Sequence, residues 1–396
     1  MREILSARRC PVCGSSEAQP LFRQTFATLS SGALLEGYDV VCCESCGFGF
    51  ADGLPDPEEF DRYYAAMSKY ERAAAGGRPS AWNQKRLRRI AETIARNAGR
   101  TDSALLDIGC ATGALLAELR DVGYSDIHGL DPSPLCARLA REVYGLAVDT
   151  GVAADLALRP PEYGVIVLSA VLEHLCDPTS VLHDTRDALV EDGAVFVEVP
   201  DVTGFAECAC APFQQFSTEH INFFSSQSLE NLLAAAGFEA ITVERHSYEW
   251  SSSTREPVLL AVFRKSAATR PPVQDNTTRR SLFEYIAVCE CIDHRIRQRL
   301  RELAETGRPV LVWGTGAHTL RLLQTGGLDG IDIAGFIDSD VNYQGKLLRG
   351  APVLSPSSVA GRGEPILISS GTVHHEIAQQ IREELGAATE TIMLYE

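Results

Sequence analysis

Short apolar runs alternate with amphipathic segments through the middle of the chain. Strands are predicted at 103–110 (SALLDIGC), 126–133 (DIHGLDPS), 163–171 (YGVIVLSAV) and 194–201 (AVFVEVPD). Helices are predicted between them at 114–124, 134–145 and 181–193. Such alternation is typical of a parallel, doubly wound α/β sheet.

A second alternating unit follows a polar, proline-containing linker at residues 265–280 and a long helix predicted from Ser281 to Glu305. Its strands are predicted within 308–327 (RPVLVWGTGAHTLRLLQTGG), 331–340 (IDIAGFIDSD) and 365–371 (PILISSG). The pattern predicts a second Rossmann-like domain. Near the N-terminus, residues 53–64 and 73–80 are interpreted as connecting segments. The predicted domains are 1–75, 76–265 and 279–396.

Composition narrows the class of protein. The 396 residues carry 36 basic and 53 acidic side chains, a net charge of −17, which disfavours nucleic acid as a partner. The basic run at 83–100 is interpreted as one face of an amphipathic helix, with Leu87, Ile90, Ile94 and Ala98 on the other. No apolar stretch suits a membrane helix or signal peptide, so a cytoplasmic location is expected.

Four of the twelve cysteines form two CxxC turns, Cys10-Pro-Val-Cys13 and Cys43-Glu-Ser-Cys46, each followed by glycine. Each turn directs two thiolates at one centre, and four thiolates make a closed tetrahedral zinc site. The sequence therefore predicts an N-terminal zinc-binding module with a structural metal, because no coordination position remains for a substrate. Cys42 breaks the spacing and is left out of the site.

A glycine turn follows the first strand of the middle unit, in LLDIGCATGALL. Asp107, Gly109 and Gly113 lie where a doubly wound sheet binds a nucleotide-like ligand, at the carboxyl ends of its strands. Asp131 ends the next strand, where it can accept hydrogen bonds from a ribose diol, and Asp155 can accept one from an adenine amino group. The DxGxAxG order with these two aspartates is the pattern of class I methyltransferases that use S-adenosylmethionine (SAM). The predicted SAM-binding residues are Asp107, Gly109, Cys110, Gly113, Asp131, Asp155, Ser169 and His174.

The second glycine turn, in VLVWGTGAH, has GxG without a third glycine. Asp338 ends the following strand and is placed like a ribose-binding carboxylate. Gly314 and Gly316 are predicted to contact the substrate's nucleotide, although a fold that only closes the cleft is the alternative.

The chain contains six motifs in this order: CPVCG, CESCG, LLDIGCATGALL, GAVFVEVPD, EHINFFS and VLVWGTGA. With this order of motifs, the chain resembles the zinc-containing NDP-sugar C-methyltransferases of deoxysugar pathways over nearly its whole length. The resemblance implies a nucleotide-linked 4-keto-6-deoxysugar as substrate. A proton leaves the carbon beside the ketone, and that carbon receives the methyl group of SAM.

The resemblance also implies catalytic residues, because the family's motif reads roughly Tyr-His-Glu-His before an aromatic segment. Glu219 and His220 match its last two positions, whereas Ser217 and Thr218 depart from it. His220 is the predicted base and Glu219 its support, since histidine accepts protons near neutral pH. A partly buried, structural histidine is the alternative interpretation.

Other residues near this motif receive weaker assignments. His174 is predicted to line the SAM pocket first and to act as a base second. Asn222 is predicted to bind sugar oxygens, and the segment 208–215 (CACAPFQQ) to cover the substrate. The predicted function is therefore base-assisted methyl transfer to carbon of a small nucleotide sugar.

Two alternatives stay open. Loss of the tyrosine at position 217 is compatible with methylation of a sugar hydroxyl on the same scaffold. A zinc-ribbon protein that recognises or methylates a macromolecule is the second alternative.

Overall fold

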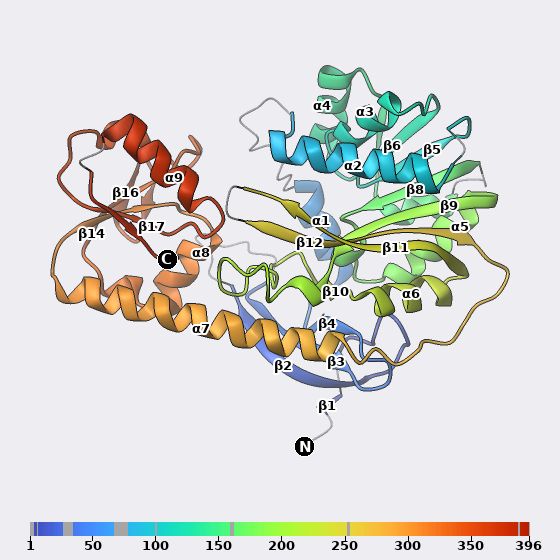
Figure 1. Ribbon diagram of the computed structural model, residues 1–396, viewed down its shortest axis with the longest axis horizontal. Helices are drawn as coiled ribbons and strands as arrows, with labels where there is room; N and C mark the ends of the chain where they lie inside the picture. The colour runs from blue at the N-terminus through green and yellow to red at the C-terminus, as the bar shows by residue number, and fades with distance from the viewer. Residues whose placement is uncertain are drawn as a thin grey trace.

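The computed structural model describes residues 4–5, 7–26, 35–66, 78–99, 101–158, 162–251, 254–386 and 389–395, which contain three sheets (Figure 1). The first sheet is antiparallel, in the order β1 (Ile4–Leu5), β2 (Glu17–Thr25), β3 (Gly37–Cys43), β4 (Gly49–Asp52) and β10 (Asn222–Phe223). Its last strand comes from a much later part of the chain. The segment that carries Glu219 and His220 is thereby joined to the cysteine-containing sheet.

The central sheet has the order β11-β12-β9-β8-β5-β6-β7. Its strands are β5 (Leu105–Ile108), β6 (Ile127–Asp131), β7 (Val148–Thr150), β8 (Tyr163–Ser169), β9 (Leu189–Pro200), β11 (Phe238–Glu249) and β12 (Arg255–Lys265). The strands β5 to β9 pair in parallel, and β12 is antiparallel to both of its neighbours. This arrangement is the predicted doubly wound sheet of a class I methyltransferase, and the fold class is confirmed.

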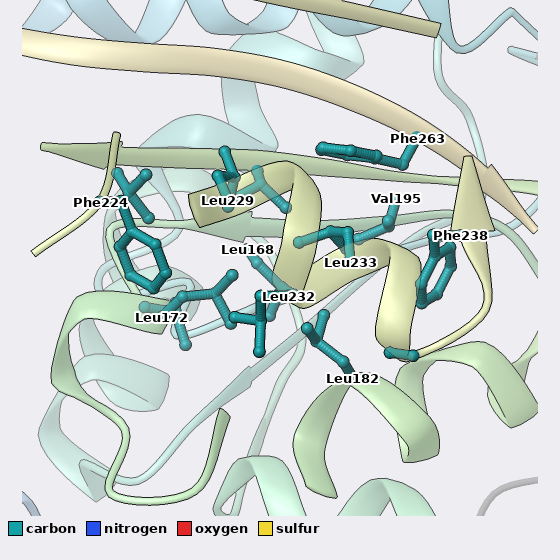
Figure 2. Close-up of a cluster of buried hydrophobic side chains, with 14 of the residues drawn as sticks. Leu168, Leu172, Leu182, Val195, Phe224, Leu229, Leu232, Leu233, Phe238 and Phe263 are labelled. Carbon is teal, nitrogen blue, oxygen red and sulfur yellow. The ribbon is translucent and has the colours of Figure 1, made fainter. Parts of the chain in front are cut away.

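Helices and short helical turns cover this sheet on both faces. They are α2 (Ala81–Asn97), α3 (Ala114–Asp121), α4 (Pro134–Tyr144), α5 (Pro178–Ala188) and α6 (Ser226–Ala235), with 3₁₀ turns η2 (Ala153–Leu158), η3 (Leu172–His174) and η4 (Val202–Gly204). Leu87, Ile90 and Ile94 of α2 are buried as expected, while Ala98 caps the helix. Figure 2 shows the opposite face, where Leu229, Leu232 and Leu233 of α6 pack beside Leu168 and Val195.

Two local predictions were wrong. The helix predicted to continue to Gly193 ends at Ala188, because Leu189 already pairs with Tyr163 and begins β9. The predicted connecting segment 53–64 contains most of α1 (Pro57–Ala66). Proline at the first helical position and two glutamates in the first turn favour a helix start.

The C-terminal sheet has the order β15-β16-β14-β13-β17-β18 and is parallel except for the β15–β16 pair. Its strands are β13 (Val310–Trp313), β14 (Ile333–Ile337), β15 (Leu347–Leu348), β16 (Ala351–Leu354), β17 (Ile366–Ile368) and β18 (Thr391–Met393). The helical segments around it are α8 (Ala317–Arg321), η5 (Leu322–Gly326), η6 (Leu328–Gly330), η7 (Pro356–Val359), α9 (His374–Gln380) and η8 (Ile381–Leu385).

The long helix α7 (Thr278–Glu305) runs from the first sheet to the C-terminal sheet (Figure 1). Leu282 and Tyr285 of its first half are buried with aromatic residues of the cysteine-containing sheet, whereas Ile296 and Leu300 belong to the C-terminal core.

The predicted linker before this helix is held by a hydrogen bond near its end, because the N–H of buried Asp275 donates to the carbonyl of Cys46 at 2.9 Å. The boundary predicted at residues 75 and 76 lies outside the described residues. Within the described ranges, no helix has the length and apolar character needed to cross a bilayer.

Candidate active site and metal centre

The two CxxC turns meet at one point. The Sγ atoms of Cys10 and Cys46 are 3.6 Å apart, those of Cys13 and Cys43 are 3.5 Å apart, and all four lie within 4.8 Å of one another. A tetrahedron with zinc–sulfur bonds of about 2.3 Å has edges of about 3.8 Å, so this cluster fits one zinc ion. The neighbouring Cys42 is excluded, because its thiol lies 3.2 Å from the carbonyl of Gly47.

The glycine turn after β5 is a cradle of left-handed backbone. Gly109 has φ +72°, Ala111 +50° and Gly113 +78°. A Cβ atom at Gly109 would lie 2.9 Å from the side chain of Val171, so glycine is required there. Such close approach of main chain, at the carboxyl edge of the sheet and before α3, suits the binding of SAM.

Asp131 closes this cradle from the end of β6. Its Oδ2 accepts a hydrogen bond from the N–H of Ala111 at 2.8 Å, and its Oδ1 accepts one from Ser133 at 2.9 Å. The side chain of Cys136 also donates to this carboxylate, which keeps one acceptor position for a ribose hydroxyl. Burial raises the pKa of Asp131, and burial followed by the charge of Asp131 raises that of Asp107 well above its ordinary value.

Two other predicted SAM contacts have different surroundings. Asp155 lies in η2, where its Oδ2 accepts a hydrogen bond from the N–H of Val152 at 2.8 Å. The side chain of Cys110 is buried in the core beside Gly129 and Leu116. Contact of Cys110 with SAM stays a prediction.

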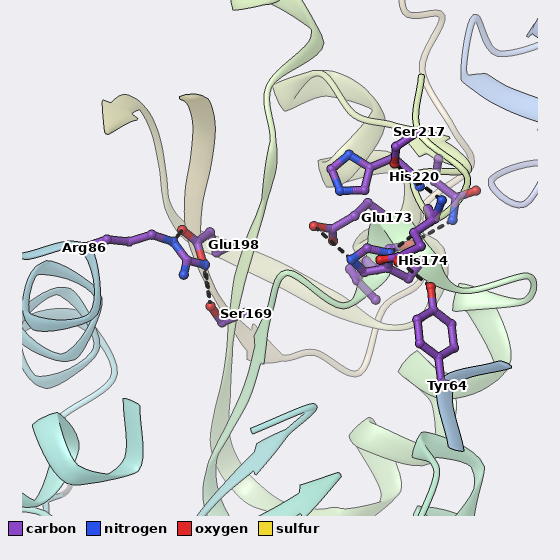
Figure 3. A network of polar contacts seen from close by, with 11 residues as sticks. Tyr64, Arg86, Ser169, Glu173, His174, Glu198, Ser217 and His220 are labelled. Carbon is purple, nitrogen blue, oxygen red and sulfur yellow. Dashed lines mark hydrogen bonds and ion pairs between the residues drawn. The ribbon is translucent and has the colours of Figure 1, made fainter. Parts of the chain in front are cut away.

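Ser169 belongs to a polar group that sequence reasoning missed. Its hydroxyl donates to Glu198 Oε2 at 2.5 Å and accepts from Arg86 at 3.3 Å, while Arg86 Nε donates to Glu198 Oε1 at 2.9 Å. Arg86 lies within the basic run at 83–100, so the interpretation of that run as a solvated helix face misses this inward residue. Figure 3 shows this group on one side of the site and the two histidines on the other.

The Glu219–His220 pair is held by contacts to distant elements. Glu219 is buried, and its Oε1 accepts a hydrogen bond from the hydroxyl of Tyr63 at 3.1 Å. The main-chain N–H of His220 donates to Ser217 Oγ at 3.1 Å, and its carbonyl accepts from Tyr38 at 3.2 Å. Ser217 thus shapes the turn that carries the predicted base.

His174 lies directly beside His220. Their ring centroids are 5.1 Å apart, and Nδ1 of His174 donates to the carbonyl of Glu219 at 2.9 Å. Because a carbonyl only accepts, this bond fixes the proton on Nδ1. The side-chain ligand atoms of Glu173, His174 and His220 lie within 4.8 Å of one another, so this group has metal-ligand spacing as well as acid/base chemistry.

Two tyrosines of α1 extend over this group. The hydroxyl of Tyr64 lies 3.3 Å from Nδ1 of His174 (Figure 3), and Tyr63 contacts Glu219. Burial, followed by the charge of Glu219, raises the pKa of Tyr64, which therefore stays a neutral phenol. Sequence reasoning missed both residues, although the Asp-Pro-Glu-Glu start of α1 is a helix signal that the sequence contains.

Asn222 does not have the surroundings predicted for a sugar contact. Its Nδ2 donates to the carbonyls of Leu172 and Leu175, both at 2.8 Å, and its Oδ1 accepts from Arg8 at 2.9 Å. The side chain is only 2% exposed. The prediction is corrected, because all of these bonds join protein segments to one another.

The second glycine turn shares with the first an aspartate that accepts a main-chain hydrogen bond from the turn, but it has only one residue with left-handed backbone. Gly314 has φ +106°, Gly316 has extended backbone, and Asp338 Oδ2 accepts from the N–H of Thr315 at 2.9 Å. Nearby elements enclose a cavity of about 270 Å³ that neither glycine lines. It is bounded by Ala209, Cys210, Ile292, Arg295, His374, Leu394 and Tyr395.

Comparisons with known proteins match the chain to methyltransferases. Residues 82–243 match the family model described as a methyltransferase domain. The C-methyltransferase NovU of Streptomyces niveus is 26% identical over 362 residues, which are 84% of this chain and 79% of that protein. The ubiquinone biosynthesis O-methyltransferase of Cereibacter sphaeroides is 28% identical over 244 residues, 54% of this chain and 97% of that protein.

One solved structure matches about half of the chain. The 1,6-didemethyltoxoflavin-N1-methyltransferase of Burkholderia thailandensis covers 56% of this chain and 96% of its own, with 17% identity and a TM-score of 0.42. From the family model and the curated relatives, the chain is a SAM-dependent methyltransferase. Its resemblance to C-methyltransferases is confirmed by its similarity to NovU.

Proposed function

We propose that the chain transfers a methyl group from SAM to carbon of a nucleotide-linked keto-deoxysugar, with His220 as the base. The observation that carries this proposal is the position of His220, which lies in a group with buried Glu219 and with the half-buried His174 and Tyr64. The similarity to NovU over most of the chain supports the same chemistry.

The proposed reaction has two steps, removal of a proton by His220 and methyl transfer from SAM. His220 takes the proton from the carbon beside the ketone, and the carbon keeps the electron pair as an enolate. Bound SAM would supply the methyl group and a sulfide leaving group, so a new carbon–carbon bond forms as the carbon–sulfur bond breaks. His220 then returns its proton to solvent. General-base assistance of this kind typically contributes about 10²–10⁴-fold.

The tyrosines of α1 replace the phenol that position 217 lacks. Tyr64 is a neutral phenol beside His174, so its hydroxyl is placed to stabilise negative charge on the ketone oxygen. Tyr63 holds the Glu219 carboxylate, and Glu219 in turn positions the turn of His220. The acceptor atom can therefore remain carbon despite the serine.

Methylation of a sugar hydroxyl is the second candidate. It is favoured by Ser217, which departs from the family's tyrosine, and by similarity of the middle domain to an O-methyltransferase. In that reaction His220 takes the hydroxyl proton and oxygen receives the methyl group.

The N-terminal cysteine-containing module and the C-terminal domain have supporting roles in this proposal. Cys10, Cys13, Cys43 and Cys46 hold one structural zinc ion, and their geometry fits it. The C-terminal domain holds the nucleotide of the substrate near Gly314 and Gly316. The parallel between Asp338 and Asp131, each bound to its own glycine turn, supports this assignment.

The test combines two measurements. Isotope-labelled SAM is incubated with a panel of keto and hydroxy NDP-sugars, products are detected by mass spectrometry, and NMR places the methyl group. Separately, a 4-keto sugar is incubated in deuterated water without SAM. Deuterium at the adjacent carbon, lost in His220→Ala and retained in Arg88→Gln on the exposed side of α2, supports C-methylation. Absence of exchange, with methyl found on oxygen, supports the second candidate, and no product from the whole panel refutes both.

A further inference from the structure

Glu173, His174 and His220 bring three metal-binding side chains together from two distant segments. Glu173 and His174 lie in the turn η3 after β8, whereas His220 lies shortly before β10. One ligand atom from each side chain lies within 4.8 Å of the other two, and Figure 3 shows the three residues together. Among the described residues, the four-cysteine cluster is the other group with this spacing. The proposed reaction uses His220 but assigns no role to the carboxylate of Glu173.

The orientation of His174 suits metal binding through Nε2. Its Nδ1 donates to the carbonyl of Glu219 at 2.9 Å, so the lone pair of the neutral ring is on Nε2. Histidines that bind metals usually have this arrangement, in which the other ring nitrogen donates to a carbonyl or a carboxylate. Nε2 lies 3.8 Å from Oε1 of Glu173, which is longer than a hydrogen bond. Two tetrahedral ligands with bonds of about 2.1 Å lie about 3.4 Å apart, so one ion fits between these atoms after a small movement.

Main-chain and side-chain hydrogen bonds hold the two segments against each other. The N–H of Ile221 donates to the carbonyl of Glu173 at 2.9 Å. Nδ2 of Asn222 donates to the carbonyls of Leu172 and Leu175, both at 2.8 Å. The backbone on both sides of the group is therefore positioned before an ion arrives, which reduces the entropy lost on binding.

Burial and ligand type indicate what the group would bind. The side chains of Glu173 and His174 are 2% and 17% exposed, and a carboxylate withdrawn from water is stabilised by pairing or by a metal ion. Two imidazoles and one carboxylate suit Zn²⁺, Ni²⁺ or Co²⁺, whereas Mg²⁺ and Ca²⁺ prefer oxygen ligands. We propose that Glu173, His174 and His220 bind one divalent transition-metal ion. Three protein ligands leave a coordination position open, so this ion exchanges more readily than one enclosed by four thiolates.

Occupancy of this second metal site inhibits the enzyme, and this part of the inference rests on the proposed function. A ring nitrogen must be deprotonated to bind a metal, and its lone pair is then no longer available to a proton. The ion and the substrate proton therefore compete for His220. Binding of the ion itself does not depend on which substrate the enzyme methylates.

Calorimetric titration of the untagged, zinc-loaded protein with Ni²⁺ tests the site. One equivalent of Ni²⁺ should bind. Glu173→Gln and His220→Ala should each weaken its binding at least about 10- to 100-fold, the typical loss when even an outer-shell partner of a metal site is removed. His128→Ala is the matched control, because His128 lies 2.8 Å from Asp126 on an exposed surface and belongs to no three-ligand group among the described residues. The control should bind Ni²⁺ like the wild type.

A second measurement uses only the wild-type protein and serves if the variants do not fold. Histidines are modified with diethyl pyrocarbonate and located by mass spectrometry, with and without Ni²⁺. The ion should protect His174 and His220 and leave His128 reactive. Absence of a bound equivalent, equal affinity in all variants, or equal modification of the three histidines would overturn the proposed site.

The inhibitory effect is tested with the deuterium exchange of a 4-keto sugar. Ni²⁺ should abolish the exchange, and excess free histidine, which removes Ni²⁺ from the protein, should restore it. Bound Ni²⁺ with undiminished exchange would overturn the inhibitory role. If no exchange occurs even without Ni²⁺, the proposed base chemistry fails, while the calorimetry still decides whether the metal site exists.

Discussion

Arg8 donates a hydrogen bond to Oδ1 of Asn222 across 214 positions of sequence. The same guanidinium also donates to the carbonyls of Ala51, Ile221, Leu175 and Cys176. Arg8 precedes the first CxxC turn by two residues, and Asn222 follows the proposed base by two. The four-cysteine cluster and the Glu219–His220 segment are therefore joined by one side chain.

Arg8→Met should lower the free energy of unfolding by about 1–3 kcal/mol, because it leaves buried carbonyls without a donor. Chemical denaturation of the purified protein measures this. Arg9→Met is the control, since Arg9 is exposed and should change stability little. Equal stability of the two variants would show that the Arg8 bonds are exchanged for water at no cost.

His220→Ala should lower the rate of the chemical step by about 10²–10⁴-fold and leave SAM affinity intact. Glu219→Gln should cost less, because it retains an acceptor for Tyr63 and acts on His220 only through the turn. Single-turnover rates and calorimetry separate the two effects. Full turnover in His220→Ala would make His220 structural and leave His174 as the candidate base.

Asp131→Ala should weaken SAM binding by about 2–3 kcal/mol, the loss expected when charge-assisted hydrogen bonds to the ribose are removed. Asp155→Ala tests the adenine contact and should cost less, since an amino group donates one bond. Calorimetry with each variant provides the comparison. Unchanged affinity in Asp131→Ala would place the ribose contact elsewhere.

Metal analysis should find about one zinc per chain, and Cys13→Ser should lose both zinc and folded protein. Cys42→Ser is the matched control, because Cys42 is adjacent to the second turn but its thiol lies against Gly47. The control should bind zinc normally. A fully folded, metal-free protein would contradict the structural role.

The unfolding free energy should fall as pH rises from about 4.5 to about 7, through Glu256. Burial raises the pKa of this carboxyl to about 7, against the hydrogen bond from Gln215. The folded chain then binds more protons than the unfolded chain across this window, so stability is highest below it and decreases with rising pH.

Glu256→Gln should flatten this part of the pH profile of thermal unfolding and leave the acid side unchanged. Glu230→Gln, at an exposed position, should keep the wild-type slope. A slope that persists unchanged in Glu256→Gln would assign the effect to other groups.

Local patterns in the sequence were sufficient to predict the strands and helices of the central sheet, the four-cysteine cluster and the glycine turn. The strand–helix alternation predicts the central sheet because apolar spacing follows the period of each element. Cys10 and Cys13 could be paired with Cys43 and Cys46 because each turn is local and four thiolates suit one ion. The glycine turn was recognisable for the same reason, since its backbone conformation depends on residues within one short segment.

Only the tertiary structure decided which side chains complete the site. Tyr63 lies 156 positions from Glu219, and Arg86 lies 112 positions from Glu198, so no spacing in the sequence connects them. The same reason explains Asn222, which is a polar residue beside the proposed catalytic pair but has hydrogen bonds to Arg8, Leu172 and Leu175. Periodicity determined the elements, whereas packing of distant elements determined which polar groups meet, because contact depends on the path of the whole chain rather than on neighbours along it.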